Sequence, residues 1–226
     1  MICGACVLSV TLTSCLKDNN NQTYNPPIAL VSFIQASPDE PSLDFTLDNN
    51  KVNVNPLDFG NAIGYFQTYA GTRTVTFTNH ANSAKIFSDT ASFAPNIAYS
   101  LFLANVPGKP EIVVLKDTIS RPADGKTSIR FVNLSPDASA VDLAIQGGSV
   151  LIPNRLYKGY SGFIPETGNT NYNFEVRQHG TNTVLATLSN ISLNSSYVYT
   201  IWLGGLSTPL NATDKLRLNI ITNAFF

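Results

Sequence analysis

Residues 31–39, with the sequence VSFIQASPD, recur almost a hundred positions later as residues 129–137, IRFVNLSPD. Each copy is an apolar stretch followed by Ser-Pro-Asp, and the second copy is offset from the first by 98 positions. The same offset relates the next apolar segments, residues 43–47 (LDFTL) and 141–145 (VDLAI). A constant offset over consecutive segments indicates an internal duplication.

The duplication divides the chain into two domains. We place the first repeat at residues 28–116, a polar linker at 117–126 and the second repeat at 127–226. Only 13% of the 226 residues are charged and 43% are hydrophobic, whereas about 25% are charged in an average globular chain. The 14 Gly and 13 Pro beside a single Met favour turns over long helices, so we expect an all-β protein.

Within each repeat the hydrophobic residues alternate with polar ones. Residues 43–47 place Leu and Phe at every second position, which is typical of a strand with one buried face. Asn49 and Asn50 follow, and Asn tolerates the positive φ that a two-residue hairpin turn requires. We expect Val52 and Val54 to continue the alternation on the returning strand. The second repeat has Gly147 and Gly148 in place of the Asn pair.

A tyrosine in each repeat indicates the type of sandwich. Tyr99 follows the apolar Phe93 by six positions across a turn, and Tyr199 follows Leu193 in the same way. This spacing resembles the tyrosine corner of immunoglobulin-like sandwiches, whose hydroxyl bonds to upstream backbone. The fold class we predict is therefore two tandem immunoglobulin-like antiparallel β-sandwiches. Trp202 lies out of phase with Tyr199, Ile201 and Leu203. We therefore expect one face of the strand that contains these residues to be less buried than the other.

The Ser-Pro-Asp motif and the Asp five positions further on carry a family resemblance. The eight residues of the two motifs are Ser37, Pro38, Asp39, Asp44, Ser135, Pro136, Asp137 and Asp142. The arrangement resembles the tandem modules of bacterial lipoproteins and secreted proteins known as domain of unknown function 4397. The resemblance implies an extracytoplasmic β-sandwich without an assigned activity.

The first residues resemble an export signal. Residues 1–14 contain no charge, and residues 12–15, LTSC, resemble the lipobox of bacterial lipoproteins. The resemblance implies that the signal is removed and that Cys15 is acylated, with residues 15–27 as a tether. The alternative is a tail that is apolar without being a signal.

Two further features of this segment bear on location and redox chemistry. Lys17 and Asp18 resemble the export signal of Bacteroidetes lipoproteins, which implies an outer-membrane protein facing the outside; a periplasm-facing anchor is the alternative. All three Cys residues precede residue 16, so no disulfide is expected. Cys3 and Cys6 have a C-x-x-C spacing without the second pair that a structural zinc site needs.

The acidic and imidazole side chains are the natural candidates for chemistry. The pairs Asp39 with Asp44 and Asp137 with Asp142 suit calcium binding or glycoside hydrolysis, but Asp in these positions also stabilises turns. His80 and His179 fall at equivalent turns, one in each repeat, with no neighbouring acid in sequence. We favour the structural role for all of them and expect no catalytic residue, metal or cofactor.

Aromatic and hydroxyl residues supply the remaining candidates. Exposed rings stack on sugars, and the rings that follow the first hairpins are candidates for ligand binding, with burial in the core as the alternative. These candidates are Tyr65, Tyr69, Tyr157 and Tyr160. Thr90 and Thr118 each follow an Asp in a triplet that resembles the O-glycosylation signal of Bacteroidetes exported proteins.

The sequence as a whole favours a binding protein of the cell envelope. A net charge of −1 offers no basic surface to nucleic acid. We predict a lipid-anchored, non-catalytic binding or adhesion module with a glycan or protein ligand. The alternatives are a carbohydrate-active enzyme that uses an Asp pair and a structural spacer in an envelope complex.

Overall fold

The computed structural model describes residues 26–38, 40–106, 108–209 and 211–226. Nearly all the regular structure there is strand, with one short 3-10 helix, η1 (Ala212–Asp214). The strands of the first repeat are β1 (Ile28–Gln35), β2 (Leu43–Leu47), β3 (Asn50–Lys51), β4 (Ala62–Tyr69), β5 (Gly71–Asn79), β6 (Lys85–Phe93), β7 (Ala98–Ala104) and β8 (Glu111–Asp117). Those of the second repeat are β9 (Lys126–Asn133), β10 (Val141–Ile145), β11 (Val150–Arg155), β12 (Ile164–Thr167), β13 (Thr170–Gln178), β14 (Val184–Leu193), β15 (Tyr197–Gly204) and β16 (Arg217–Phe225). None of the described segments forms a helix that could cross a membrane.

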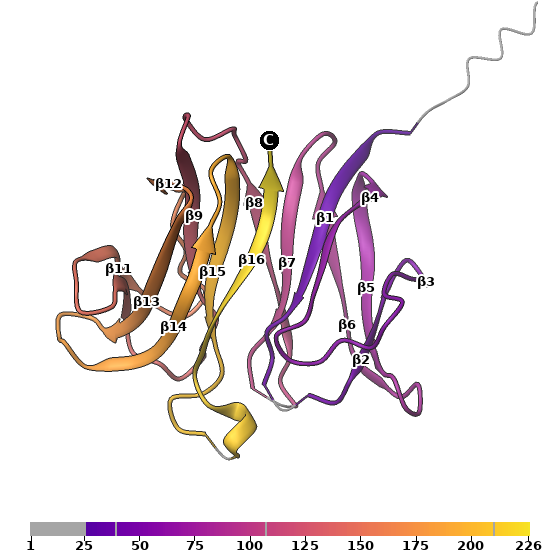
Figure 1. The fold of residues 1–226 in the computed structure, drawn as a ribbon. Coiled ribbons are helices and arrows are strands. Elements are labelled where there is room, and N and C mark those ends of the chain that lie inside the picture. Colours follow the sequence, from indigo (N-terminus) through magenta and orange to yellow (C-terminus); the bar gives the residue numbers. More distant parts are fainter. Residues whose placement is uncertain (1–25, 39, 107, 210) are drawn as a thin grey trace, which may run out of the picture.

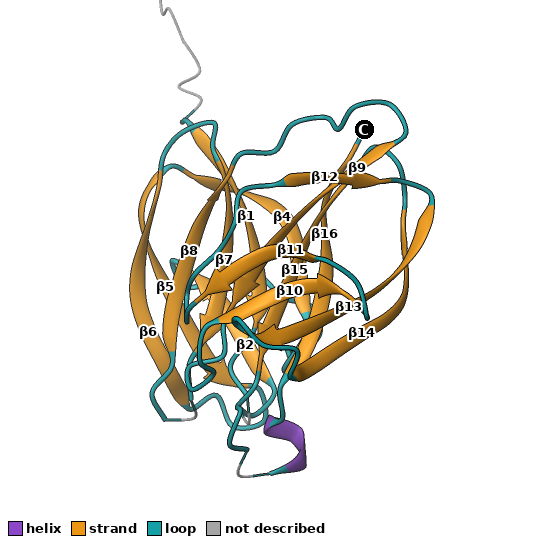
Figure 2. Ribbon diagram, turned by 90° about the vertical axis from the view of Figure 1, so that its left-hand side faces the viewer, coloured by secondary structure: helices purple, strands orange, loops and turns teal. Residues whose placement is uncertain are grey.

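The two repeats have the same topology. The first repeat forms sheets in the order β4-β1-β7-β8 and β3-β2-β5-β6, and the second forms β12-β9-β15-β16 and β11-β10-β13-β14. Neighbouring strands are antiparallel except β1 with β7 and, at the equivalent place, β9 with β15. The prediction of two β-sandwiches in tandem is confirmed, with one parallel strand pair in each. Figure 2 shows how strands make up almost all of the regular structure.

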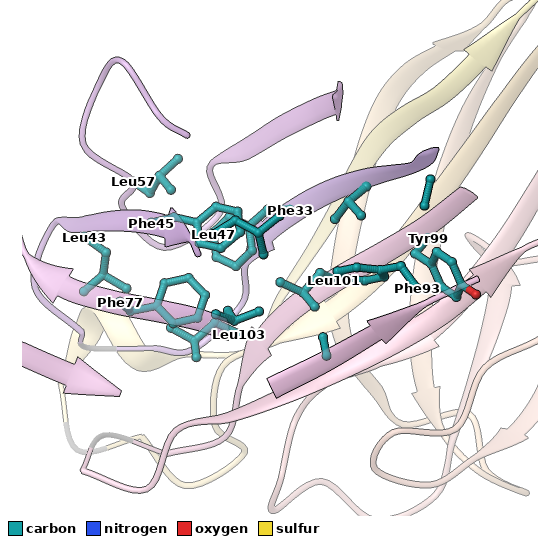
Figure 3. Packing of buried hydrophobic residues seen from close by; sticks show 14 residues of the cluster. Phe33, Leu43, Phe45, Leu47, Leu57, Phe77, Phe93, Tyr99, Leu101 and Leu103 are labelled. Atoms are coloured by element: carbon teal, nitrogen blue, oxygen red, sulfur yellow. The ribbon is translucent and has the colours of Figure 1, made fainter. Parts of the chain in front are cut away.

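Each sandwich closes on its own core. In the first repeat the rings of Phe33, Phe45 and Phe77 lie with centroids 4.8–5.2 Å apart (Figure 3). All three are fully buried, and burial of one such side chain contributes about 1.5–3 kcal/mol. The alternation of residues 43–47 places Phe45 in this core, as expected for a strand with one buried face.

The corner tyrosines bond to the backbone that precedes their strands. The Tyr99 hydroxyl accepts a hydrogen bond from the Ala94 amide at 3.0 Å, and the Tyr199 hydroxyl accepts one from the Asn194 amide at 3.2 Å. Figure 3 shows the Tyr99 ring beside Phe93 at the end of the core. Each repeat thus shares this corner with immunoglobulin-like domains.

A third core joins the two repeats. The sheets β4-β1-β7-β8 and β12-β9-β15-β16 face each other, so the four sheets form four layers (Figure 1). Apolar residues from both inner sheets are buried between them, among them Ile34, Phe102, Val132 and Trp202. The expectation of a less buried face beside Trp202 is wrong, because one face of β15 packs in its own sandwich and the other against the first repeat.

A buried ion pair crosses the same interface. Arg130 Nη1 lies 2.5 Å from Asp117 Oδ1, and the two side chains are 2% and 0% exposed. Arg130 also donates to Ser100 Oγ at 2.8 Å and to Thr200 Oγ1 at 2.8 Å. Asp117 was expected in the linker, but it ends β8 and, with its Arg partner, belongs to the interface. Lys126 likewise begins β9 rather than ending the linker.

The first hairpin also differs from the sequence prediction. Its turn residues are Asp48 and Asn49, with φ of 48° and 68°, so the turn lies one residue earlier than expected. The returning strand β3 contains only Asn50 and Lys51. Val54, expected on a buried strand face, is 92% exposed. The regular strand therefore ends almost immediately after the turn, and the backbone of Val52 and Leu57 bonds to β2 further along.

Candidate functional site: a groove at the edge of the first repeat

A buried asparagine explains why the chain leaves the sheet at the edge of β2. Asn53 Oδ1 accepts a hydrogen bond from the Phe45 amide at 2.7 Å. Its Nδ2 donates to the Asp44 carboxylate at 3.1 Å and to the Asn55 carbonyl at 2.8 Å. The side chain thus satisfies the Phe45 amide at the edge of β2, whereas the Phe45 carbonyl accepts the Val52 amide and Leu43 pairs with Leu57 through the backbone. Residues 53–56, between these backbone pairings, form a wall beside the sheet edge.

Between β4 on one side and the β2–β3 hairpin with that wall on the other lies a groove. Two adjoining hollows, of about 480 Å³ and 450 Å³, share Val52 and follow β4 from one end to the other. We call this surface the edge groove. Its polar and aromatic lining comprises Asp48, Asn50, Lys51, Asn53, Asn55, Asn61, Phe66, Gln67, Thr68 and Tyr69. Ile28 lines it too, so the groove lies where the N-terminal segment joins the first strand.

The most exposed aromatic ring of the groove is Tyr69. It is 57% exposed, and the Arg73 guanidinium lies 6.0 Å from its ring centroid. Arg73 is held in place by a hydrogen bond to the Tyr69 carbonyl at 2.9 Å and by Asp48 at 3.0 Å. The ring is therefore kept on the surface, beside a fixed cation, and is available to a ligand.

The charges around the groove neutralise one another. Asp48 pairs with Arg73 and accepts the Thr74 amide at 2.8 Å. Burial disfavours ionisation of Asp48, but these bonds outweigh it and hold its pKa below the usual value. Lys51 lies 2.8 Å from Asp44. The two charged side chains that line the groove, Asp48 and Lys51, are thus both already paired.

In each repeat the structure brings the strand Asp of the motif against the imidazole of the same repeat. His80 Nδ1 lies 3.0 Å from Asp44 Oδ1, and His179 Nδ1 lies 2.8 Å from Asp142 Oδ1. Sequence reasoning missed this, because each acid lies more than thirty residues from its His. No group of three or more metal-ligating side chains occurs among the described residues.

The Asp pair of the second motif is not brought together as one site. Asp137 accepts the Ser207 and Thr208 amides at 2.8 and 2.9 Å, whereas Asp142 accepts the Asn154 amide at 2.6 Å. The two carboxylates share no hydrogen-bond partner in the described part of the chain. Asp39 lies outside the described residues.

The Ser of each motif takes part in the turn. The amide of Ser37 donates to Gln35 Oε1 at 2.8 Å, and that of Ser135 to Asn133 Oδ1 at 3.0 Å. Pro38, which follows, is buried, whereas Pro136 is half-buried. These contacts belong to the turn that ends β1 and β9.

Of the four candidate ligand-binding tyrosines, two contact the other repeat. The Tyr65 hydroxyl donates to Asp117 and accepts from Asn223 Nδ2 at 3.1 Å. Burial, with the nearby Asp117 charge, raises the pKa of Tyr65 to about 12. The Tyr157 hydroxyl donates to Glu111 at 2.7 Å across the interface. These two rings are interface residues and form no stacking platform with Tyr69.

Tyr160 is 50% exposed but lies beside Val132 in the second repeat, away from the edge groove. The two candidate glycosylation threonines are both exposed. Thr90 lies on the outer strand β6, whereas Thr118 follows the buried Asp117. Cys15, the candidate lipidation site, lies outside the described residues.

Fold and groove together define a tandem β-sandwich protein with a polar groove at one edge. The chain belongs to the family described as Domain of unknown function (DUF4397), whose model matches residues 29–144. The match spans the first repeat and continues through the second Ser-Pro-Asp motif into β10. A search of curated proteins finds no match.

Three solved structures illustrate the more distant comparisons. A family 26 carbohydrate-binding module of Eubacterium rectale Amy13K, in complex with maltoheptaose, is 10% identical; the match covers 87% of this chain and 97% of that one, with a TM-score of 0.26. A streptococcal virulence factor described by its alpha-glucan binding is 11% identical over 84% and 97%, with a TM-score of 0.27. The TIE protein of Bacillus anthracis is 10% identical over 79% of this chain and 34% of its own, also at 0.27. At these identities and TM-scores, the comparisons carry no argument about the ligand or mechanism of this protein.

Proposed function

We propose that the protein is a non-catalytic binding module of the cell envelope, and that the edge groove of the first repeat is its ligand-binding surface. The observation that carries this proposal is the groove itself. It combines the exposed ring of Tyr69 with several exposed amide side chains along β4 and the facing wall. A concave surface with a few convergent polar groups is the usual form of a ligand site.

The ionisation of the motif carboxylates supports a non-catalytic role. Burial opposes the charged forms of Asp137 and Asp142, but backbone amides and, for Asp142, His179 lower the pKa of each carboxyl. A general acid for glycoside hydrolysis needs a raised pKa, and its partner must flank the same bond. Asp137 and Asp142 are instead committed to separate loops.

The proposal includes a lipid anchor at Cys15. Twelve residues separate Cys15 from Ile28, and an extended chain spans at most about 3.5 Å per residue. An anchored module would therefore keep the N-terminal end of β1, and the groove beside it, within about 40–45 Å of the bilayer. Outer-membrane location and exposure to the outside are part of the same proposal.

Two experiments test this function. Labelling of cells with an alkyne palmitate should mark the parent and not a Cys15→Ala variant; equal labelling would remove the anchor. For the groove, the purified chain is screened against arrays of envelope glycans and envelope proteins. We expect Tyr69→Ala to weaken the binding found about tenfold, and Tyr160→Ala, which removes a ring of similar exposure elsewhere, to leave it unchanged. An affinity that Tyr69→Ala does not change would exclude the groove.

A further inference from the structure

The edge groove is suited to one class of ligand, and the inference that follows rests on the proposed function. Its polar surface is dominated by carboxamides. Asn50, Asn55, Asn61 and Gln67 line the two hollows and are exposed. A carboxamide both donates and accepts hydrogen bonds, and so does a hydroxyl group. Neighbouring hydroxyls of a sugar ring can therefore each be matched by such a side chain.

The charge arrangement disfavours an ionic ligand. Asp48 is compensated by Arg73, and Lys51 by Asp44, at 3.0 and 2.8 Å. An acidic or basic polymer would have to compete with these internal partners. Without an uncompensated charge, electrostatic complementarity contributes little to recognition of a charged chain.

The strand beside the groove disfavours an extended peptide. A peptide that adds to a sheet edge needs an uninterrupted row of backbone donors and acceptors. The register of β4 against β1 shifts between the Val31 and Phe33 pairs, where Gly64 and Tyr65 lie opposite Ser32 alone. Such a bulge leaves the edge irregular and is a common protection against strand addition.

Tyr69 supplies the apolar part of the recognition. An aromatic side chain offers a flat apolar face and, in Tyr, a polar hydroxyl at the tip. Arg73 restrains the ring, so less side-chain freedom is lost when a ligand stacks on it. From this arrangement we infer that the edge groove binds a neutral glycan chain, one sugar stacked on Tyr69 and its neighbours hydrogen-bonded by Gln67 of β4 and by the Asn side chains that line the groove.

The test is a titration of the whole chain with neutral oligosaccharides of several linkages, with uronic-acid and sulfated oligosaccharides, and with extended peptides. We expect a neutral oligosaccharide to bind with an affinity that hardly changes as salt is raised. Tyr69→Ala and Gln67→Ala should each weaken it about tenfold. Tyr160→Ala is the matched control, and melting temperatures confirm that the variants are folded.

The outcomes separate the ligand class from the binding function. Preference for charged oligosaccharides, with affinity that falls steeply with salt, would overturn the neutral-glycan inference. Tyr69-dependent binding of a peptide or protein would also overturn it, while the edge groove would stand as the binding surface. If no oligosaccharide, peptide or envelope protein bound in a Tyr69-dependent manner, both proposals would fall.

Discussion

The two repeats have the same strand order but differ at one edge. In the second repeat, β11 has six residues, three of them in register with β10, and the carboxylate of Asp142 accepts the Asn154 amide, which ties the strand to the sheet. In the first, β3 has two residues; the side chain of Asn53 accepts the Phe45 amide, while the backbone of Val52 and Leu57 bonds to the rest of the β2 edge. The comparison teaches that a buried amide can substitute for part of a strand and leave a groove beside it.

The facing sheets show a second difference at equivalent positions. Ser32 on β1 corresponds to Arg130 on β9. Asp117 on β8 accepts a hydrogen bond from Ser100, and Asn223, at the bulge of β16, takes its place by accepting one from Thr200. The duplicated surfaces thus meet face to face, but one carries the cation and the other the anion. Two copies of the same surface packed together would bury charges of one sign without a partner. The pairing of the first repeat with the second is therefore specific.

The largest effect is expected when each of these charged interface residues is replaced by its counterpart from the other repeat. Arg130→Ser or Asp117→Asn alone leaves a buried charge without its partner, and we expect each to lower the free energy of unfolding by about 3–5 kcal/mol. The loss in unfolding free energy of the double variant should be smaller than the sum of the two single losses by about 1–3 kcal/mol. Urea denaturation of the full chain measures all four proteins.

An exposed ion pair across the same interface provides the control. Lys158 and Glu111 are paired, but their side chains are 44% and 30% exposed. Lys158→Ala should therefore cost less than about 1 kcal/mol. Equal losses from Lys158→Ala and Arg130→Ser would show that burial does not distinguish the two pairs.

The next effect concerns the edge of the first repeat. Asn53→Ala leaves the buried Phe45 amide without its acceptor, and we expect a loss of about 1–3 kcal/mol in unfolding free energy. Asn55→Ala, two residues away and exposed, should change it by less than about 0.5 kcal/mol. Amide hydrogen exchange should show faster exchange of Phe45 in Asn53→Ala, with β10 of the second repeat unaffected; protection at Phe45 would contradict the role of Asn53.

A smaller and symmetrical effect is expected at the tyrosine corners. Tyr99→Phe and Tyr199→Phe each remove one hydrogen-bond acceptor from a backbone amide, at 3.0 and 3.2 Å. We expect each to cost about 1 kcal/mol, measured by thermal or urea unfolding. A loss in only one repeat would show that the two corners are not energetically equivalent.

Much of the fold could be predicted from local patterns, because alternation and turn spacing depend on neighbours in sequence. The packing of one repeat against the other could also have been predicted. Residues 101–103 and 201–203 are continuous apolar runs, which are typical of strands buried on both faces. The partner of Arg130 could not be identified, because Asp117 reaches it only through the tertiary arrangement. The groove could not be predicted either, since Val52 and Val54 fit a strand pattern that the side chain of Asn53 overrides.

The smallest effect should appear as a pH-dependent difference between the two Asp–His pairs. Burial opposes ionisation of Asp44 and Asp142, but hydrogen bonds outweigh it, so the pKa of each is lower in the folded state than its usual value of 3.8. A lowered folded pKa stabilises the protein above the unfolded pKa, and this stability is lost as pH falls through the folded pKa. The deficit of Asp44→Asn or Asp142→Asn relative to the parent should thus be full near neutral pH and shrink below about pH 4. Asp142→Asn should show the larger deficit, because Asp142 accepts backbone amides that cannot turn to other partners, whereas Asp44 is held by the side chains of Lys51, Asn53 and His80. Urea midpoints measured across this pH range test both points, and a deficit that grows towards acid pH would contradict the assigned direction.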